Sequence, residues 1–341
     1  MYANEKKINR LFVSWLSVSL ILVFVIIIIG GLTRLTNSGL SITEWELFDG
    51  IFPPLNERSW ENYFNQYKQI PQYKIMNFNM TMEEFKVIFY WEYIHRFLAR
   101  LIGLFFLLPL IFFYFSKKIK NEYMSVCFII FILIVIQGII GWYMVKSGLS
   151  NDITVSHYRL SIHLFTAVFI ISGIFWIIKN VKASKNKIFF KLTKNNLPFQ
   201  FLILLIFFQI IIGAFVSGLD AGQIYQTWPM MGNTFIPNDL LINNLINVLE
   251  FDNHSLVQFY HRNLAYLIVL YVLLLTLYIY KKKILNLYFS IKILLFFLFL
   301  QAALGIFTLV SALNIYLASA HQITSVLLIF SALNLYYLRA K

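Results

Sequence analysis

The sequence predicts an all-α polytopic membrane protein, with eight transmembrane helices arranged as two pseudo-repeated four-helix bundles. The first reason is composition: 60% of the 341 residues are hydrophobic, 13% are charged, and the mean hydropathy is +0.73. A soluble protein of this length could not bury so much apolar surface. The second reason is a series of apolar runs that approach or exceed the ~20 residues needed to cross a bilayer. The third is that the last four runs repeat motifs of the first four.

The apolar runs define the predicted spans, which are about 11–32, 88–115, 123–145, 158–178, 199–218, 256–280, 286–310 and 315–338. The first run shows no cleavable signal peptide and is long enough to remain a spanning helix. The single cysteine, Cys127, excludes an internal disulfide and a cysteine-based metal cluster. It lies in an apolar run, so we expect a buried structural thiol.

The distribution of charge gives the orientation. Most of the 28 Lys and Arg lie in the segments that join the spans on one side, which are 1–10, 116–122, 179–198, 281–285 and 339–341. Only Glu5 and Glu122 of the acidic residues lie there. By the positive-inside rule both termini face the cytoplasm, or the matrix if the protein is mitochondrial. The net charge of +13 is therefore a topology signal, and its spread over short loops argues against nucleic-acid binding.

The two halves carry the same motifs in the same order. The corresponding stretches are GGLTRLTNSGLSITEW and GAFVSGLDAGQIYQTW, EYIHRFLARLIG and QFYHRNLAYLIV, QGIIGWYMVKSGL and QAALGIFTLVSAL, and LSIHLFTAVFI and ASAHQITSVLL. Aligning their histidines gives offsets of 261 − 95 = 166 and 321 − 163 = 158 residues. Such a parallel duplication predicts an N-terminal half over residues 1–198 and a C-terminal half over 199–341.

Four of the six histidines recur at equivalent places in the two halves; they are His95, His163, His261 and His321. Each lies about five to seven residues into a span that enters from the outer face, roughly 8–11 Å deep at 1.5 Å per residue. Within each half, a facing pair could fill both axial positions of a heme iron. Zinc is disfavoured, because each pair lacks a further carboxylate or thiolate ligand. His157 and His254 have no copies, and we expect surface or supporting roles for them.

Two arginines directly follow histidines of the second and sixth spans. A residue one step along a helix points about 100° away, so Arg96 and Arg262 would not bind the iron. Each could instead meet a heme propionate at the mouth of the pocket. The alternative is snorkelling toward the interface. Weaker candidates for the same role are Arg34, Arg100 and Arg159.

The two copies differ beside the first histidine. Glu92 lies three residues before His95, one turn away on the same helical face, whereas the second copy has Gln258. A carboxylate beside a heme in a low-dielectric pocket is a candidate proton carrier. The alternative is a salt bridge to Arg96 or to another arginine at the outer end. The difference predicts chemistry in the first half and a permanent redox heme in the second.

Taken together, the motifs resemble the heme A synthase family, and most closely its mitochondrial and α-proteobacterial branch. The resemblance rests on GGLTRLTNSGLSITEW, IFPPL, EYIHR, LSIHL, TWPMMGNTFIP, FYHR and AHQ, and it extends from about residue 12 to 336. It implies conversion of heme O to heme A in the inner membrane, by oxidation of the C8 methyl group of the porphyrin to a formyl group. Some bacterial members carry a cysteine pair in an outer loop, and this sequence has none.

The resemblance also implies roles for the matching residues. Glu92, His95 and His163 would be the catalytic residues at the substrate heme, and His261 with His321 would ligate a heme b that relays electrons. Heme O synthase and the assembly of cytochrome oxidase are the implied functional links. The electron donor, the source of the formyl oxygen and self-association of the chain are left open. The lack of an evident transit peptide favours a bacterial inner membrane.

Two other functions compete with this interpretation. A di-heme cytochrome b that passes electrons across the membrane would need hemes at two depths, whereas these histidines are predicted to share one depth. A transporter would have paired, Gly- or Pro-interrupted spans at a midplane site, and neither half has them.

Overall fold

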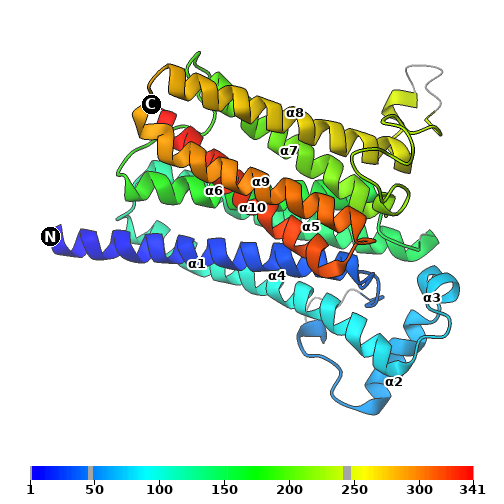
Figure 1. The fold of residues 1–341 in the computed structure, drawn as a ribbon. Coiled ribbons are helices and arrows are strands. Elements are labelled where there is room, and N and C mark those ends of the chain that lie inside the picture. Colours follow the sequence, from blue (N-terminus) through cyan, green and yellow to red (C-terminus); the bar gives the residue numbers. More distant parts are fainter. Residues whose placement is uncertain (1, 45–48, 152, 241–246, 341) are drawn as a thin grey trace. The chain divides into compact units, whose positions relative to one another are not determined.

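The computed structural model describes residues 2–44, 49–151, 153–240 and 247–340, and this part of the chain contains helices but no β-strand (Figure 1). The helices long and apolar enough to cross a membrane are α1 (Tyr2–Leu35), α4 (Met82–Ser116), α5 (Asn121–Asn151), α6 (His157–Lys182), α7 (Leu197–Gly218), α8 (His254–Lys281), α9 (Tyr288–Val310) and α10 (Ile315–Arg339). The predicted all-α polytopic class is confirmed.

The contacts of the chain divide it into two compact units, Met1–Ile170 and Ile171–Lys341. The division falls within α6. The predicted functional division at residue 198 lies farther along, in the first turn of α7. It remains a prediction, because compactness does not show which half binds which group.

In the first unit α4 packs against α1 and α5. Aromatic side chains fill the α1–α4 contact: Phe12 and Trp15 of α1 meet Phe106 and Phe113 of α4, with ring centroids 4.8–5.5 Å apart. The Trp15 indole also donates a hydrogen bond to the Phe105 carbonyl (3.1 Å), so its polar edge is satisfied inside the bundle. This contact fixes α1 beside the helix that carries His95.

The long segment between α1 and α4 is itself folded. It contains α2 (Glu57–Tyr67) and α3 (Pro71–Met76), which lie beside the start of α4 (Figure 1). The Asn56 side chain caps α2 by accepting a hydrogen bond from the Ser59 amide. Tyr67 is fully buried and hydrogen-bonds to Gln72 and Asn77. Burial raises the pKa of Tyr67 to about 12.

Several helix ends lie beyond the predicted spans, such as the start of α1 at Tyr2 rather than near residue 11, and two more concern α4 and α5. The helix α4 begins at Met82 rather than near residue 88, because Thr81 and Glu84 form a capping box that starts it outside the apolar run. The helix α5 continues to Asn151 rather than ending near residue 145. Both extensions lengthen helices beyond the segment that hydropathy marks.

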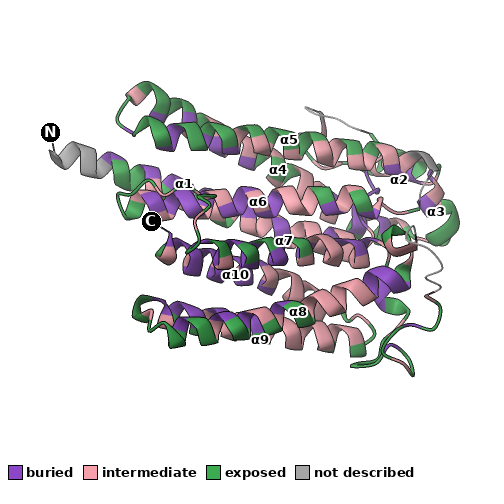
Figure 2. Cartoon of the chain, turned by 90° about the horizontal axis from the view of Figure 1, so that it is seen from above, coloured by how far each residue is buried: buried purple, intermediate pink, exposed green. Residues whose placement is uncertain are grey.

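In the second unit α7 packs against α8 and α10, and α9 packs against α10. Of the residues in the apolar stretch of α7, 56% are buried, whereas in that of α9 only 17% are, so α9 is suited to face lipid (Figure 2). The segment after α6 is tied to the end of α10, since the Lys187 ammonium donates to the Tyr337 and Ala340 carbonyls. A short 3-10 helix, η2 (Ala221–Gln223), follows α7 closely in this unit.

Candidate functional site

The predicted histidines come together as two pairs, one in each unit. His95 on α4 and His163 on α6 have ring centroids 6.4 Å apart. His261 on α8 and His321 on α10 have the same separation, 6.4 Å. The sequence therefore identified the correct partners, and the duplicated spacing is reproduced in the geometry.

Each imidazole lies against a glycine of a neighbouring helix. The pairs are Gly30 with His95, Gly141 with His163, Gly213 with His261, and Gly305 with His321. A Cβ atom built on these glycines would lie 3.0, 3.1, 3.0 and 2.8 Å from the imidazole Cε1 atom, respectively. Carbon atoms normally pack at about 3.5–4.0 Å. A side chain at Gly305 would therefore require the ring to move, and at the other three positions the ring would have to shift by a few tenths of an ångström.

The pairs fit a heme better than a bare metal ion. Two imidazoles on opposite sides of one metal, with metal–nitrogen bonds of about 2 Å each, would have ring centres about 6 Å apart. No group of three or more His, Cys, Asp or Glu is placed to hold a metal within the described ranges. A tetrahedral zinc site needs more protein ligands than two histidines, whereas a porphyrin supplies the other iron ligands itself.

Glu92 lies one helical turn before His95 on α4 and is only 2% exposed. Its carboxylate accepts hydrogen bonds from the Ser41 hydroxyl (2.7 Å), the Ile42 amide (2.8 Å) and the Arg96 guanidinium (2.6 and 3.1 Å). The salt bridge to Arg96 is the alternative that the sequence had left open. Together the two residues hold the loop after α1 against α4.

The second unit has a similar arrangement, but with a hydrogen-bond donor where the first unit has the acceptor Glu92. Gln258 replaces Glu92, and its amide donates to the Tyr225 carbonyl (2.9 Å). Arg262 donates to the Tyr225, Thr227 and Met230 carbonyls at 2.8–3.3 Å. In both units, therefore, a side chain one turn before the histidine and an arginine one step after it fasten the loop that follows the preceding helix.

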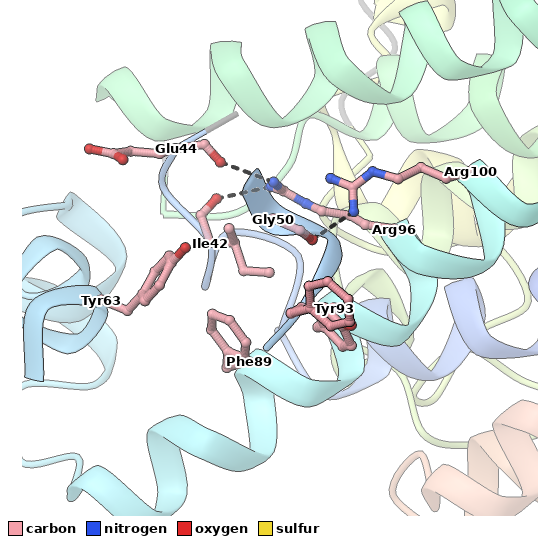
Figure 3. Close-up of a pocket in the computed structure, with 9 residues that line it drawn as sticks. Ile42, Glu44, Gly50, Tyr63, Phe89, Tyr93, Arg96 and Arg100 are labelled. Carbon is pink, nitrogen blue, oxygen red and sulfur yellow. Dashed lines mark hydrogen bonds between the residues drawn. The ribbon is translucent and has the colours of Figure 1, made fainter. Parts of the chain in front are cut away.

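The two arginines predicted to meet propionates donate hydrogen bonds to carbonyl groups of these loops. Arg96 also donates to the carbonyls of Ile42 (2.9 Å) and Glu44 (3.2 Å), as Figure 3 shows. The Arg262 Nε atom is buried and has no hydrogen-bond partner among the described residues. Arg262 thus keeps a buried donor for an anionic group.

Two cavities adjoin Arg96 in the first unit. The cavity in Figure 3 lies between α4 and the loop after α1; Arg100 also faces it and donates to the Gly50 carbonyl (2.8 Å). The other, of about 200 Å³, is lined by Arg96 together with Trp142 and Lys146 of α5. Its volume is below the ~300–1,000 Å³ of typical ligand pockets, so it is too small for a whole heme.

The structure gives the remaining candidates other surroundings. His157 starts α6 and is 6% exposed, so a surface role does not apply to it, while His254 starts α8 and is exposed. The Arg159 guanidinium lies over the Tyr143 ring at 5.0 Å. Arg34 donates to the Asn37 side chain (2.8 Å) at the end of α1.

The sequence analysis missed the glycines and the glutamines that precede them. Gln137, Gln209 and Gln301 stand four residues before Gly141, Gly213 and Gly305, and their amides hydrogen-bond to the partner histidines. The repeated pattern Q-x-x-x-G was a signal that could have identified them.

Comparisons with known proteins point to one family. A family model described as cytochrome oxidase assembly protein matches residues 13–333. The chain is 46% identical over 339 residues to the heme A synthase of Pelagibacter ubique, covering 97% of each chain. It is 40% identical over 334 residues to the heme A synthase of Rickettsia africae, covering 97% of this chain and 98% of that one. With the heme A synthase of Parvibaculum lavamentivorans it shares 43% identity over 259 residues, covering 76% of this chain and 74% of that one.

Proposed function

This chain belongs to the heme A synthase family of cytochrome oxidase assembly proteins, and we propose on that basis that it oxidises the C8 methyl group of heme O to the formyl group of heme A. The observation that carries the proposal is the presence of two histidine pairs with the same 6.4 Å separation. A single heme protein needs one such pair, whereas a heme-modifying enzyme with its own redox heme needs two.

We assign the substrate heme to the first pair. His95 and His163 would bind its iron, and Glu92 stands one helical turn from His95 on the same helix. The substrate is amphipathic, with propionates at one edge and a farnesyl tail, so a site near the membrane surface suits both ends. The two imidazoles would hold the iron, and contacts of the chain with the propionates and the farnesyl tail would determine which ring edge faces Glu92.

We assign heme b to the second pair. His261 and His321 would hold it, and a bound heme b would supply one-electron transfer to and from the first half. The buried Arg262 Nε donor is a candidate partner for a propionate. Gln258 in place of Glu92 leaves no carboxylate at this position, as expected for a heme that is not chemically changed.

We assign proton handling to Glu92. Its carboxylate is held by hydrogen bonds from Ser41, Ile42 and Arg96, so its position is fixed before substrate binds. This fixed carboxylate beside His95 is the group to which we assign acceptance of the protons released when the methyl group is oxidised. In the first half Arg96 would then act mainly on Glu92, and less on a propionate.

The same proposal covers the protein's setting. If each of the eight candidate spans in the described residues crosses the membrane, both termini would lie on one side, and the basic short loops support the cytoplasmic side of an inner membrane. Heme O synthase would supply the substrate, and the assembly of cytochrome oxidase would consume the product.

Heme analysis tests the proposal directly. The chain is expressed with a source of heme O and an active electron supply, and the extracted hemes are identified by pyridine hemochrome spectra and mass. We expect heme A from the native chain and only heme O and heme B from the His163→Ala control. Unchanged heme O with the native chain would reject the enzyme assignment and favour a di-heme electron carrier.

A further inference from the structure

The four histidines differ in how their neighbours hold them. Three of the four glycines that face a histidine are preceded, four residues earlier, by a glutamine; these stretches are QGIIG at 137–141, QIIIG at 209–213 and QAALG at 301–305. The fourth stretch is IIIIG at 26–30, where Ile26 takes the place of glutamine. Residues four apart share a helical face, so each of these side chains lies one turn from its glycine.

In the second half both imidazole rings have hydrogen-bond partners. The Gln209 amide nitrogen lies 3.1 Å from Nδ1 and 3.3 Å from Nε2 of His261. The His321 Nδ1 atom is 3.1 Å from the Gln301 carbonyl oxygen, and its Nε2 atom is 3.4 Å from the Gln301 amide. A partner on Nδ1 leaves Nε2 for a metal and fixes both the tautomer and the ring orientation.

The glutamine side chains of this half also have an unused acceptor. The Oε1 atoms of Gln209 and Gln301 are buried and without a hydrogen-bond partner in the described segments. The amide nitrogen and oxygen can exchange places by a rotation. The Gln209 oxygen could thereby accept from the Nδ1–H of His261 when Nε2 binds iron.

In the first half the rings are not held in this way. The Nδ1 atoms of His95 and His163 are buried and lack a hydrogen-bond partner within the part of the chain that the structure covers. Gln137 donates to the backbone carbonyl of His163 (3.0 Å), as Gln209 also does to that of His261 (3.0 Å), and its Oε1 atom is likewise buried without a partner among the described residues. Unlike Gln209, it does not also bond to the Nδ1 atom of the ring. Ile26, the counterpart of the glutamines near His95, has no polar atom in its side chain.

We propose that Gln209, through its side chain, and residue 301, mainly through its backbone carbonyl, are positioning residues that make the second half a site of heme retention, and that Ile26 leaves His95 the releasable ligand through which substrate heme enters and product leaves. The inference rests on the proposed function, because only an enzyme that exchanges one heme and keeps another needs this difference. A partner on the distal nitrogen of a metal-bound histidine strengthens the metal bond, and its loss typically costs about 10–100-fold in metal affinity.

The transfer of heme from the purified full-length protein to apomyoglobin measures both sites. His95→Ala and His261→Ala variants, which each weaken one site, assign the fast and slow phases of release. We expect Ile26→Gln to slow the first-half phase by about 10-fold or more. Ile26→Leu, which conserves volume without adding a polar group, is the matched control and should release heme at the native rate.

The glutamine variants test the other half. Gln209→Leu should speed release from the second half by about 10-fold or more, and should shift the reduction potential of the heme that remains. Gln301→Leu should have a smaller effect, because the backbone carbonyl of residue 301 still accepts from His321. Gln209→Glu, which keeps an acceptor for the ring N–H, should restore slow release.

The outcomes distinguish a failure of the positioning roles from a failure of the proposed function. Native release rates in Ile26→Gln and in both leucine variants would overturn the positioning roles while leaving the histidine assignments intact. Native heme content in both His95→Ala and His261→Ala would instead overturn the proposed function. Misfolding cannot mimic the result for Ile26→Gln, because a gain of retention is expected.

Discussion

The replacement of Gly305 by alanine tests the histidine sites most sharply. A Cβ atom at this position would lie 2.8 Å from the Cε1 atom of His321 and 3.3 Å from its Nδ1 atom. Carbon atoms pack at about 3.5–4.0 Å, so the imidazole must move by about 0.7–1.2 Å. Metal sites tolerate deviations of only about 0.2 Å in ligand distance. The displacement is several times larger, and we expect the affinity for heme b to fall by more than about 10-fold.

The measurement is the heme b content per polypeptide after purification, from the pyridine hemochrome spectrum. Gly138→Ala is the matched control: Gly138 also lies within a membrane helix, but a Cβ there would meet nothing within 4 Å. Alanine is favoured over glycine in a helix by up to about 1 kcal/mol, so this control should be as stable as the native chain or more so. Circular dichroism establishes that both variants remain helical.

Full heme b content and an unshifted spectrum in Gly305→Ala would refute the reasoning, because the ring would then not need the space that glycine leaves. The same substitution at Gly213 should also lower heme b, since its Cβ would lie 3.0 Å from His261. At Gly30 and Gly141, with distances of 3.0 and 3.1 Å, it should instead impair binding of heme O and spare heme b.

The other predictions address the remaining roles. Glu92→Gln should keep heme b bound but greatly reduce heme A. Ser41→Ala, which removes one hydrogen bond to Glu92 worth about 1 kcal/mol, should leave most of the heme A. Equal losses in the two variants would show that Glu92 has only a structural role. His261→Ala and His321→Ala should each reduce retained heme b, and normal heme b in both would remove them as ligands. Because the pKa of Tyr67 is raised from 10 to about 12, its neutral form is favoured in the folded state, and the stability that Tyr67 contributes should fall as the pH rises from 10 to 12. Tyr67→Phe should show a smaller fall in its melting temperature over that interval, and an equal fall would exclude Tyr67 as the cause.

The spans and the histidine pairs could be predicted because they depend on strong sequence signals. Each apolar run must be long enough to cross the hydrocarbon core of the bilayer. The duplication also gives each half its own copy of a similar histidine spacing. The match of His95 with His163, and of His261 with His321, follows from motif order alone. The helix ends were less accurate, since α4 is extended by the capping box at Thr81 rather than by hydropathy.

The folded segment between α1 and α4 could not be predicted from hydropathy. The helix α2 is polar on one side and buries Phe64 and Tyr67 on the other, so it resembles a loop when only apolar runs are counted. Its core forms with Phe85 of α4 and with Leu40, which are distant in the sequence. Such contacts depend on the tertiary arrangement, and no local pattern specifies them.

The hydrogen-bond acceptors of the arginines could also not be predicted from the sequence. A guanidinium carries five N–H donors, and the position of Arg96 one step after His95 says nothing about which acceptors it meets. The structure directs these donors to Glu92 and to the carbonyls of Ile42 and Glu44. A propionate would therefore have to compete with backbone acceptors already in place at Arg96.

The energetics of this ion pair bear on why the first half has a carboxylate at all. Removing two charges from water costs several kcal/mol per ion, and the attraction between them often fails to repay that cost. The second half fastens its equivalent loop with Gln258, a neutral amide that donates to the Tyr225 carbonyl. Fastening the loop therefore does not require a charge at this position. We therefore infer that the carboxylate of Glu92 serves another purpose, which in the proposed function is proton handling beside His95.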